Sequence, residues 1–354
     1  MALSKIRSDS MTDVAIQSNR NLIINGAMNV SQRATSVASI TTSGYRTLDR
    51  FNLLVESIGT WTMSQDTDVP TGQGFAKSLK IDCTTADSSP AVADRMFLRQ
   101  NLEGQDLQRM KKGTANAEAV TLSFWVKATK TGTHVVNLLD LDNSRMICKT
   151  YTISTTNTWE KQEIVYTGDT TGAFDNDNAG SLQLEWWLAA GTNSTSGTLQ
   201  TTWGSIVAAN RAVGQVNTAD STNNNWAITG VQLEVGDVAT AFEHEDIGTT
   251  LRKCQRYYYP AEKYNSYAGW AMTWGAATQY PKVNASFPVT MRATPTISYA
   301  QSNNGTANQI EWGDATTAAS SWGLDADGIY YVVTASNISA NQYGQFRYTA
   351  DAEL

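Results

Sequence analysis

The stretch SLQLEWWLAA (181–190) carries side chains with the chemistry of a sugar-binding surface. Carbohydrate recognition needs exposed aromatic faces that stack on sugar rings and nearby carboxylate or amide groups that bond hydroxyls. Its alternating apolar positions, expected on one face of a strand, are Leu182, Leu184, Trp186 and Leu188. Trp187 and Glu185 then point the other way, and we expect them to emerge together on an outer face.

Two further tryptophans have the same potential. Trp125 lies on the outward side of the strand pattern VTLSFWVKA (120–128), and Trp203 lies in the polar segment 191–225. A segment of that length and composition is typically functional or disordered. The competing interpretation is that these rings are covered by another strand, by a second domain or by a sister subunit.

Clustered oxygens at 140–143 (DLDN) and 175–178 (DNDN) have the chemistry that Ca²⁺ prefers. Neither segment has the spacing of an EF-hand loop, and Asp and Asn are also ordinary turn residues between strands. We therefore interpret both segments as turns and predict no metal site.

Catalytic signals are sparse. His134 and His244 are the only histidines, and no nucleophile elbow, zinc motif, P-loop or dinucleotide fingerprint is present. Pairs for glycoside hydrolysis can be assembled from several carboxylates, but the sequence places no two of them at catalytic separation. The candidates are Asp49, Asp94, Glu185 and Glu234. We predict no catalytic residues, no cofactor and no enzymatic activity, with a polysaccharide depolymerase as the less favoured alternative.

Composition limits the partners. The 354 residues carry a net charge of −7, which disfavours nucleic acid and an anionic membrane surface. Cys83, Cys148 and Cys254 have no ligand-like or paired spacing and fit a chain made in a reducing cytosol. The first residues contain no apolar signal region, and no window reaches the roughly 20 apolar residues of a membrane span.

The pattern predicts an all-β protein, because short alternating runs are separated by Gly, Asn and Asp turns. We expect a jelly-roll β-sandwich followed by a short connector helix and a smaller C-terminal β-sandwich. The predicted boundaries are 1–20 for an N-terminal arm, 21–245 for the jelly roll, 246–259 for the connector and 260–354 for the last domain.

The stretch 226–259 joins these parts. Its first half predicts a strand with one face formed by Ala227, Thr229, Val231, Leu233 and Val235. A helix is predicted from Gly248 to Tyr259, because Ile247, Leu251, Cys254 and Tyr258 form one apolar stripe. Tyrosine can bury its ring while its hydroxyl stays in contact with water, so we expect the tyrosines at the end of this helix to line an interdomain or intersubunit seam. Its residues are Leu251, Cys254, Tyr257, Tyr258 and Tyr259.

Several separated blocks resemble known proteins. NLIINGAM (21–28), LSFWVKA (122–128), WEK (159–161) and WAITGVQL (226–233) resemble jelly-roll carbohydrate-binding modules. The order of NLIINGAM, DRF, GDTTG, GVQLEVGDVATAFEH and LRKCQRYY more closely resembles bacteriophage tail-fibre and virion appendage proteins. The likeness covers about residues 20–260 and is looser in the C-terminal domain.

The resemblance implies a role in host attachment. It implies a virion protein made in the host cytoplasm, a homotrimeric fibre, an N-terminal arm that docks on other tail or capsid proteins, and non-covalent binding of host surface polysaccharide. The alternative is a purely structural decoration or connector protein of the virion without a ligand.

Overall fold

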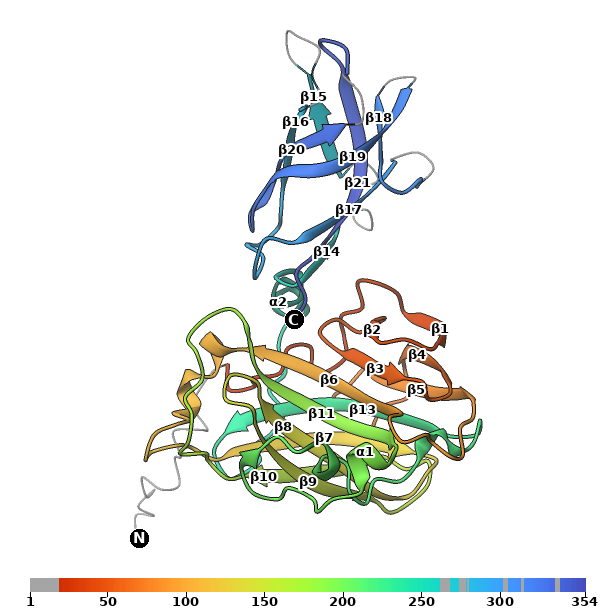
Figure 1. Cartoon of the computed structure of the whole chain (residues 1–354), viewed down its shortest axis with the longest axis vertical. Helices are drawn as coiled ribbons and strands as arrows, with labels where there is room; N and C mark the ends of the chain where they lie inside the picture. The colour runs from red at the N-terminus through yellow and green to blue at the C-terminus, as the bar shows by residue number, and fades with distance from the viewer. Residues whose placement is uncertain are drawn as a thin grey trace, which may run out of the picture. The chain divides into compact units, whose positions relative to one another are not determined.

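The computed structural model describes residues 19–261, 268–273, 278, 280–301, 305–312, 315–334 and 338–354. The chain divides into two compact units, residues 1–245 and residues 246–354. Both are built almost wholly from antiparallel strands, which confirms the predicted all-β fold (Figure 1). Of the predicted N-terminal arm, only Asn19 and Arg20 fall within the described residues.

Residues 19–245 form a β-sandwich of two antiparallel sheets, as predicted. The six-stranded sheet has the order β1 (Ser36–Ile40), β4 (Thr60–Asp66), β5 (Ser78–Thr85), β13 (Asn225–Val235), β7 (Val120–Ala128) and β10 (Glu160–Tyr166). The seven-stranded sheet has the order β12 (Gly204–Ser205), β9 (Arg145–Ile153), β8 (Gly132–Asp140), β11 (Gly180–Ala190), β6 (Arg95–Glu103), β3 (Asn52–Glu56) and β2 (Gly44–Tyr45). Short helical turns lie between strands: η3 (Gly104–Asp106), η4 (Gln108–Met110), α1 (Thr192–Thr195), η5 (Ala208–Asn210) and η6 (Thr218–Asp220).

Period-two alternation places the main core between these sheets. The inward side chains of β7 and β11 are those predicted: Val120, Leu122, Phe124, Val126, Leu182, Leu184, Trp186 and Leu188. Each large apolar side chain buried in this way contributes roughly 1.5–3 kcal/mol. The side chains at the intervening positions of both strands face outward from the sandwich. Any surface site on these two strands must therefore be built from them.

β13 does not keep one alternation along its length. Its core side chains are Trp226, Ile228, Val231 and Leu233. The inward positions therefore change from even-numbered to odd-numbered residues along the strand. The prediction that all odd-numbered residues share one face is wrong for the first half of β13. There Ala227 and Thr229 lie on the side away from the core, and Thr229 donates its hydroxyl to the Lys77 carbonyl at 2.7 Å.

A bulge at Gly230 causes this change. The register between β13 and β7 shifts between Thr229 and Gln232, and Gly230 has a φ of +62°. One extra residue in a strand turns all following side chains to the opposite face. A Cβ at Gly230 would lie 2.5 Å from the Phe75 ring, so both backbone conformation and space require glycine here.

The first described residues are fastened to β13. Asn21 donates its side-chain Nδ2 to the Val231 carbonyl at 3.1 Å, and its Oδ1 accepts the backbone N–H groups of Ile23 and Leu233. Leu22 also donates its N–H to the Leu233 carbonyl at 2.8 Å. The two blocks NLIINGAM and GVQLEVG thus form one structural element, which we call the closing strap (residues 19–26 with 230–243).

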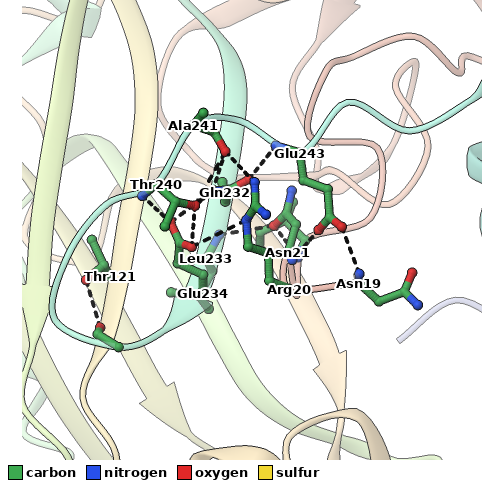
Figure 2. A network of polar contacts seen from close by, with 12 residues as sticks. Asn19, Arg20, Asn21, Thr121, Gln232, Leu233, Glu234, Thr240, Ala241 and Glu243 are labelled. Carbon is green, nitrogen blue, oxygen red and sulfur yellow. Dashed lines mark hydrogen bonds and ion pairs between the residues drawn. The ribbon is translucent and has the colours of Figure 1, made fainter. Parts of the chain in front are cut away.

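Charged residues complete the closing strap (Figure 2). The Glu243 carboxylate accepts the backbone N–H groups of Asn19 and Asn21 at 2.7 and 2.9 Å. Arg20 donates to the Ala241 carbonyl at 2.7 Å and lies 3.7 Å from the buried carboxylate of Glu234. The points where the chain enters and leaves the sandwich are therefore held together.

The second unit begins with α2 (Ile247–Gln255), where the Asp246 side chain caps the helix by accepting the Thr249 N–H at 2.9 Å. Its described strands are β14 (Tyr258–Pro260), β15 (Gly269–Met272), β16 (Lys282–Ser286), β17 (Thr296–Gln301), β18 (Gln309–Trp312), β19 (Ala315–Leu324), β20 (Gly328–Thr334) and β21 (Tyr343–Asp351). Pairing runs from β21 through β15, β16, β20, β19 and β18 back to β21, so this sheet closes on itself.

The connector helix is shorter than predicted. It ends near Gln255, because Tyr258, Tyr259 and Pro260 pair with Asp351, Ala350 and Thr349 of β21. Of the predicted seam residues, Cys254 and Tyr257 are buried, and Leu251, Tyr258 and Tyr259 are half-buried. Their role in an interface stays a prediction.

The bulge at Gly230 provides a stability test. We expect Gly230→Ala to lower the free energy of unfolding by about 2–4 kcal/mol, since it adds a steric clash to an unfavourable φ. Gly72→Ala is the matched control, because Gly72 has a φ of +76° and open space around its Cα. It should cost only about 1 kcal/mol. Urea unfolding followed by tryptophan fluorescence measures both, and equal losses would contradict the role assigned to the Phe75 contact.

Candidate functional site

The outer face of the seven-stranded sheet holds the first predicted sugar-binding pair. Trp187 and Glu185 do lie on the side opposite the main core, but both have 0% exposure. Arg211 forms an ion pair with Glu185, and its guanidinium lies 5.2 Å from the Trp187 ring centroid and 5.6 Å from that of Phe97. The prediction that Trp187 and Glu185 emerge on an open surface is therefore wrong.

Residues 191–217 cover this face and are firmly attached to it. Asn137 donates to the Arg211 carbonyl at 2.8 Å, and Gln215 accepts the Val135 N–H at 2.7 Å. The polar segment also adds strand β12 to the sheet edge beside β9, and helix α1 contacts β11. We call residues 191–217 the cover, and a second small core lies beneath it.

Trp203 belongs to the cover and is half-buried. Its indole N–H donates to the Thr167 carbonyl at 2.7 Å, and its ring lies 5.5 Å from the Lys112 ammonium. Trp203 thus has a structural partner on its edge and another on its face. Unlike a surface ring, the Trp203 ring also packs against the main hydrophobic core, which favours packing over sugar stacking for Trp203.

Lys112 is buried in a cage of oxygens under Trp203. Its ammonium pairs with Asp140, lies 3.2 Å from Asp169 Oδ2 and donates to the carbonyls of Thr171 and Gly172 at 2.8 and 2.6 Å. The Asp140 carboxylate also accepts the Asn143 N–H at 3.0 Å, which is the geometry of a turn. In the second aspartate segment, Asp175 donates its N–H to Asp142 at 3.0 Å.

The carboxylates considered for hydrolysis have structural partners. Asp49 bonds Gln32, Asp94 accepts the Ala91 N–H at 2.7 Å, and Glu234 accepts the Thr240 N–H at 2.9 Å. The fourth, Glu185, is the ion-pair partner already described. Of the histidines, His134 is buried and stacked on Tyr151, and burial lowers the pKa of its imidazole to about 4. His244 is exposed beside Phe75 and Phe242.

The outer face of the six-stranded sheet is different, because two indole rings there are only half-buried. Trp125 on β7 faces outward as predicted, between Lys161 of β10 and Thr229 of β13. Two residues further along β7, the ammonium of Lys127 lies 5.5 Å from the ring of Trp159. Sequence reasoning did not select Trp159, which stands immediately before β10.

Asp68 joins this group from a distant loop. Its carboxylate forms an ion pair with Lys127 and accepts the Trp159 indole N–H at 3.0 Å. Because Asp68 precedes Trp159 by 91 residues, no local pattern indicates the contact. We call Asp68, Trp125, Lys127, Trp159 and Lys161 the Trp125 face.

The Trp125 face combines ring surfaces with charged hydrogen-bonding groups. The Trp159 ring is oriented by its bond to Asp68 and its contact with Lys127, so little side-chain freedom is left to lose on binding. Exposed indole faces stack on the apolar faces of sugar rings, and carboxylate or ammonium groups bond hydroxyls. This arrangement can hold a sugar without covalent chemistry.

No metal-ligand group of three or more His, Cys, Asp or Glu occurs within the described part of the chain. No helix in that part is long and apolar enough to cross a membrane. The sequence matches no protein-family model and no curated protein.

Several solved structures align with part of the chain at low identity and low TM-score. The enzymatically active domain of bacteriophage CBA120 tailspike protein 4 aligns at 16% identity and a TM-score of 0.31, over 61% of this chain and 21% of that one. A family 11 carbohydrate-binding module from Clostridium thermocellum aligns at 9% identity and 0.28, over 59% and 98%. A xylan-binding domain from Paenibacillus barcinonensis aligns at 11% and 0.26, over 57% and 95%. At these values the likeness assigns neither a family nor an activity to the chain.

Burial of Trp187 has a measurable consequence. Trp187→Ala should lower the free energy of unfolding by about 3–5 kcal/mol. The substitution leaves a cavity under the cover and removes one of the aromatic rings that the Arg211 guanidinium contacts. Trp125→Ala removes a half-buried surface ring outside both cores and should cost about 1 kcal/mol. Urea denaturation compares the two, and a Trp187→Ala variant as stable as Trp125→Ala would contradict the packing described here.

Proposed function

We propose that the first unit binds glycans non-covalently through the Trp125 face. The observation that carries this proposal is the pair of half-buried indole rings, Trp125 on β7 and Trp159 immediately before β10, with Asp68 and Lys127 in contact with Trp159. Among the tryptophans first considered, Trp187 is closed off by the cover and Trp203 is used in packing.

Binding at such a face should be modest per site. Two rings and a few hydroxyl contacts give a small, open site, and several linked copies would raise the overall affinity through effective concentration. This favours a surface-attachment role, in which many weak contacts act together, over capture of a scarce small molecule.

We further propose that the chain is a phage tail-fibre or virion appendage protein, trimeric and without enzymatic activity, that attaches the particle to host surface polysaccharide. The support is the ordered set of sequence blocks described above. The residues of two of these blocks form the closing strap, so they support a common fold more directly than a common ligand. A structural decoration protein and a polysaccharide depolymerase are the competing functions.

The proposal is tested with the double variant Trp125→Ala/Trp159→Ala in affinity electrophoresis against host capsule and cell-wall polysaccharides. Retention should weaken about 10-fold or more, as expected for loss of central aromatic contacts. Val165→Ala is a matched control, because Val165 is exposed on the outer side of β10 and should leave retention unchanged.

Different outcomes separate the candidate functions. Retention unaffected by the double substitution would remove the Trp125 face from consideration. A wild-type protein retained by no polysaccharide would favour the decoration role. Oligosaccharides released from capsule during incubation would favour the depolymerase.

A further inference from the structure

The second unit has the more exposed aromatic surface. In residues 19–245 the exposed large apolar side chains are all valine or leucine. In the described part of the second unit, four aromatic side chains are 43–62% exposed: Trp270, Tyr280, Tyr330 and Tyr343. Exposed aromatic rings gathered on one small unit indicate an interaction site.

Strand register places two of these rings together. Trp270 of β15 pairs with Gln345 of β21, and Met272 pairs with Tyr343. Trp270 and Tyr343 are therefore diagonal neighbours on adjacent strands, a separation that aromatic side chains can bridge. Both point outward, since Gly269, Ala271 and Gly344 between them are buried.

The same register brings polar groups beside the rings. Gln345 also pairs with Glu311 of β18, so Trp270, Gln345 and Glu311 form one row across three strands. Met272 pairs in turn with Lys282 of β16. We call this set the Trp270 face: Trp270, Met272, Lys282, Glu311, Tyr343 and Gln345.

The backbone under the Trp270 face is supported directly by core rings. A Cβ at Gly269 would lie 2.2 Å from the Phe346 ring, and one at Gly344 would lie 2.9 Å from the Trp312 ring. Phe346 and Trp312 therefore press against the backbone where glycine leaves room, immediately beneath Trp270 and Tyr343. A platform held in this way is pre-organised, which reduces the entropy lost on binding.

We propose that the Trp270 face is a second glycan-binding site, specific for uncharged oligosaccharides. Lys282 and Glu311 contribute one charge of each sign, so the six residues of the face have no net charge, and Arg347, the next outward residue of β21, is half-buried. Indole and phenol rings offer stacking surfaces, and the Gln345 amide and Glu311 carboxylate offer hydrogen bonds to hydroxyls in the same row.

The size of the face favours a short sugar segment over a protein. Two rings about half exposed present roughly 200 Å² of aromatic surface. A stable protein interface buries about 800 Å² on each partner. A segment of a few sugar rings covers the smaller area, and its alternating apolar faces and hydroxyl edges match rings beside an amide and a carboxylate.

This site is separate from the Trp125 face, and its existence does not depend on the function proposed for the first unit. Two sites on one chain would bind a polysaccharide with an effective concentration set by the linkage between them.

The test uses the full chain with both tryptophans of the first face removed (Trp125→Ala/Trp159→Ala), so that binding reports on the second unit. Cellohexaose, xylohexaose and mannohexaose are the uncharged probes, and a galacturonate hexamer is the charged one; binding is measured by titration calorimetry. At least one uncharged probe should bind, and raising NaCl from about 0.05 to 0.5 M should leave its affinity unchanged, because no ion pair with the ligand is screened.

Adding Trp270→Ala or Tyr343→Ala to this background should weaken that binding about 10-fold, and Trp270→Phe should retain most of it. Tyr330→Ala is the matched control, because Tyr330 is a 43%-exposed tyrosine outside the Trp270 face. Circular dichroism of each variant verifies folding.

Three results would overturn the proposal. One is the absence of binding by every uncharged probe in the Trp125→Ala/Trp159→Ala background. Another is an equal loss with Tyr330→Ala. The third is a Trp270→Ala variant that keeps its glycan affinity but sediments at a lower mass than its parent, which would assign the face to self-association.

Discussion

The buried ammonium of Lys112 is the interaction on which the first unit most depends. A lysine with this burial is tolerated only when oxygens surround it, and removing its partners would cost about 3–5 kcal/mol. Those oxygens come from the end of β8 and from the turn 169–172, and Trp203 of the cover closes the cage from above. One internal charge therefore fixes a loop, a strand end, a turn and the cover at the same place.

The cover decides how the two outer faces of the sandwich differ. Over the seven-stranded sheet it converts an outward row containing Trp187 and Glu185 into a second interior, with Arg211 bonded to the glutamate and stacked on the tryptophan. Over the six-stranded sheet, the described residues bury neighbours such as Ser123 and Thr229 but leave Trp125 and Trp159 only half-buried. The same sandwich thus has one face buried under the cover and one face with partly accessible aromatic rings.

Much of the fold follows from local sequence pattern. Alternation in β7 and β11 identifies their inward side chains correctly, because β7 pairs regularly with β10 along its length and β11 pairs regularly from Leu182 to Trp187. The same rule fails in β13, where one glycine shifts the alternation, and it also overlooks β19, whose Ala, Thr and Ser residues give little apolar contrast.

The candidate site was less accessible to sequence reasoning. Trp125 could be placed by alternation alone, but its neighbour Asp68 comes from a loop that no periodicity connects to β10. The burial of Trp187 depends on a polar segment docked through single side chains such as Arg211, Gln215 and Asn137. Such contacts are set by the tertiary structure and leave no repeating signal in the sequence.

The closing strap also has a mechanical consequence. Since Glu243 holds the amides of Asn19 and Asn21, tension between the chain before Asn19 and the chain after Glu243 is borne first by this outermost contact of the closing strap. The two sheets lie outside this load path, so the tension does not stretch them. Under such tension the sandwich itself carries little load, and its first point of yield is the carboxylate–amide contact at the junction.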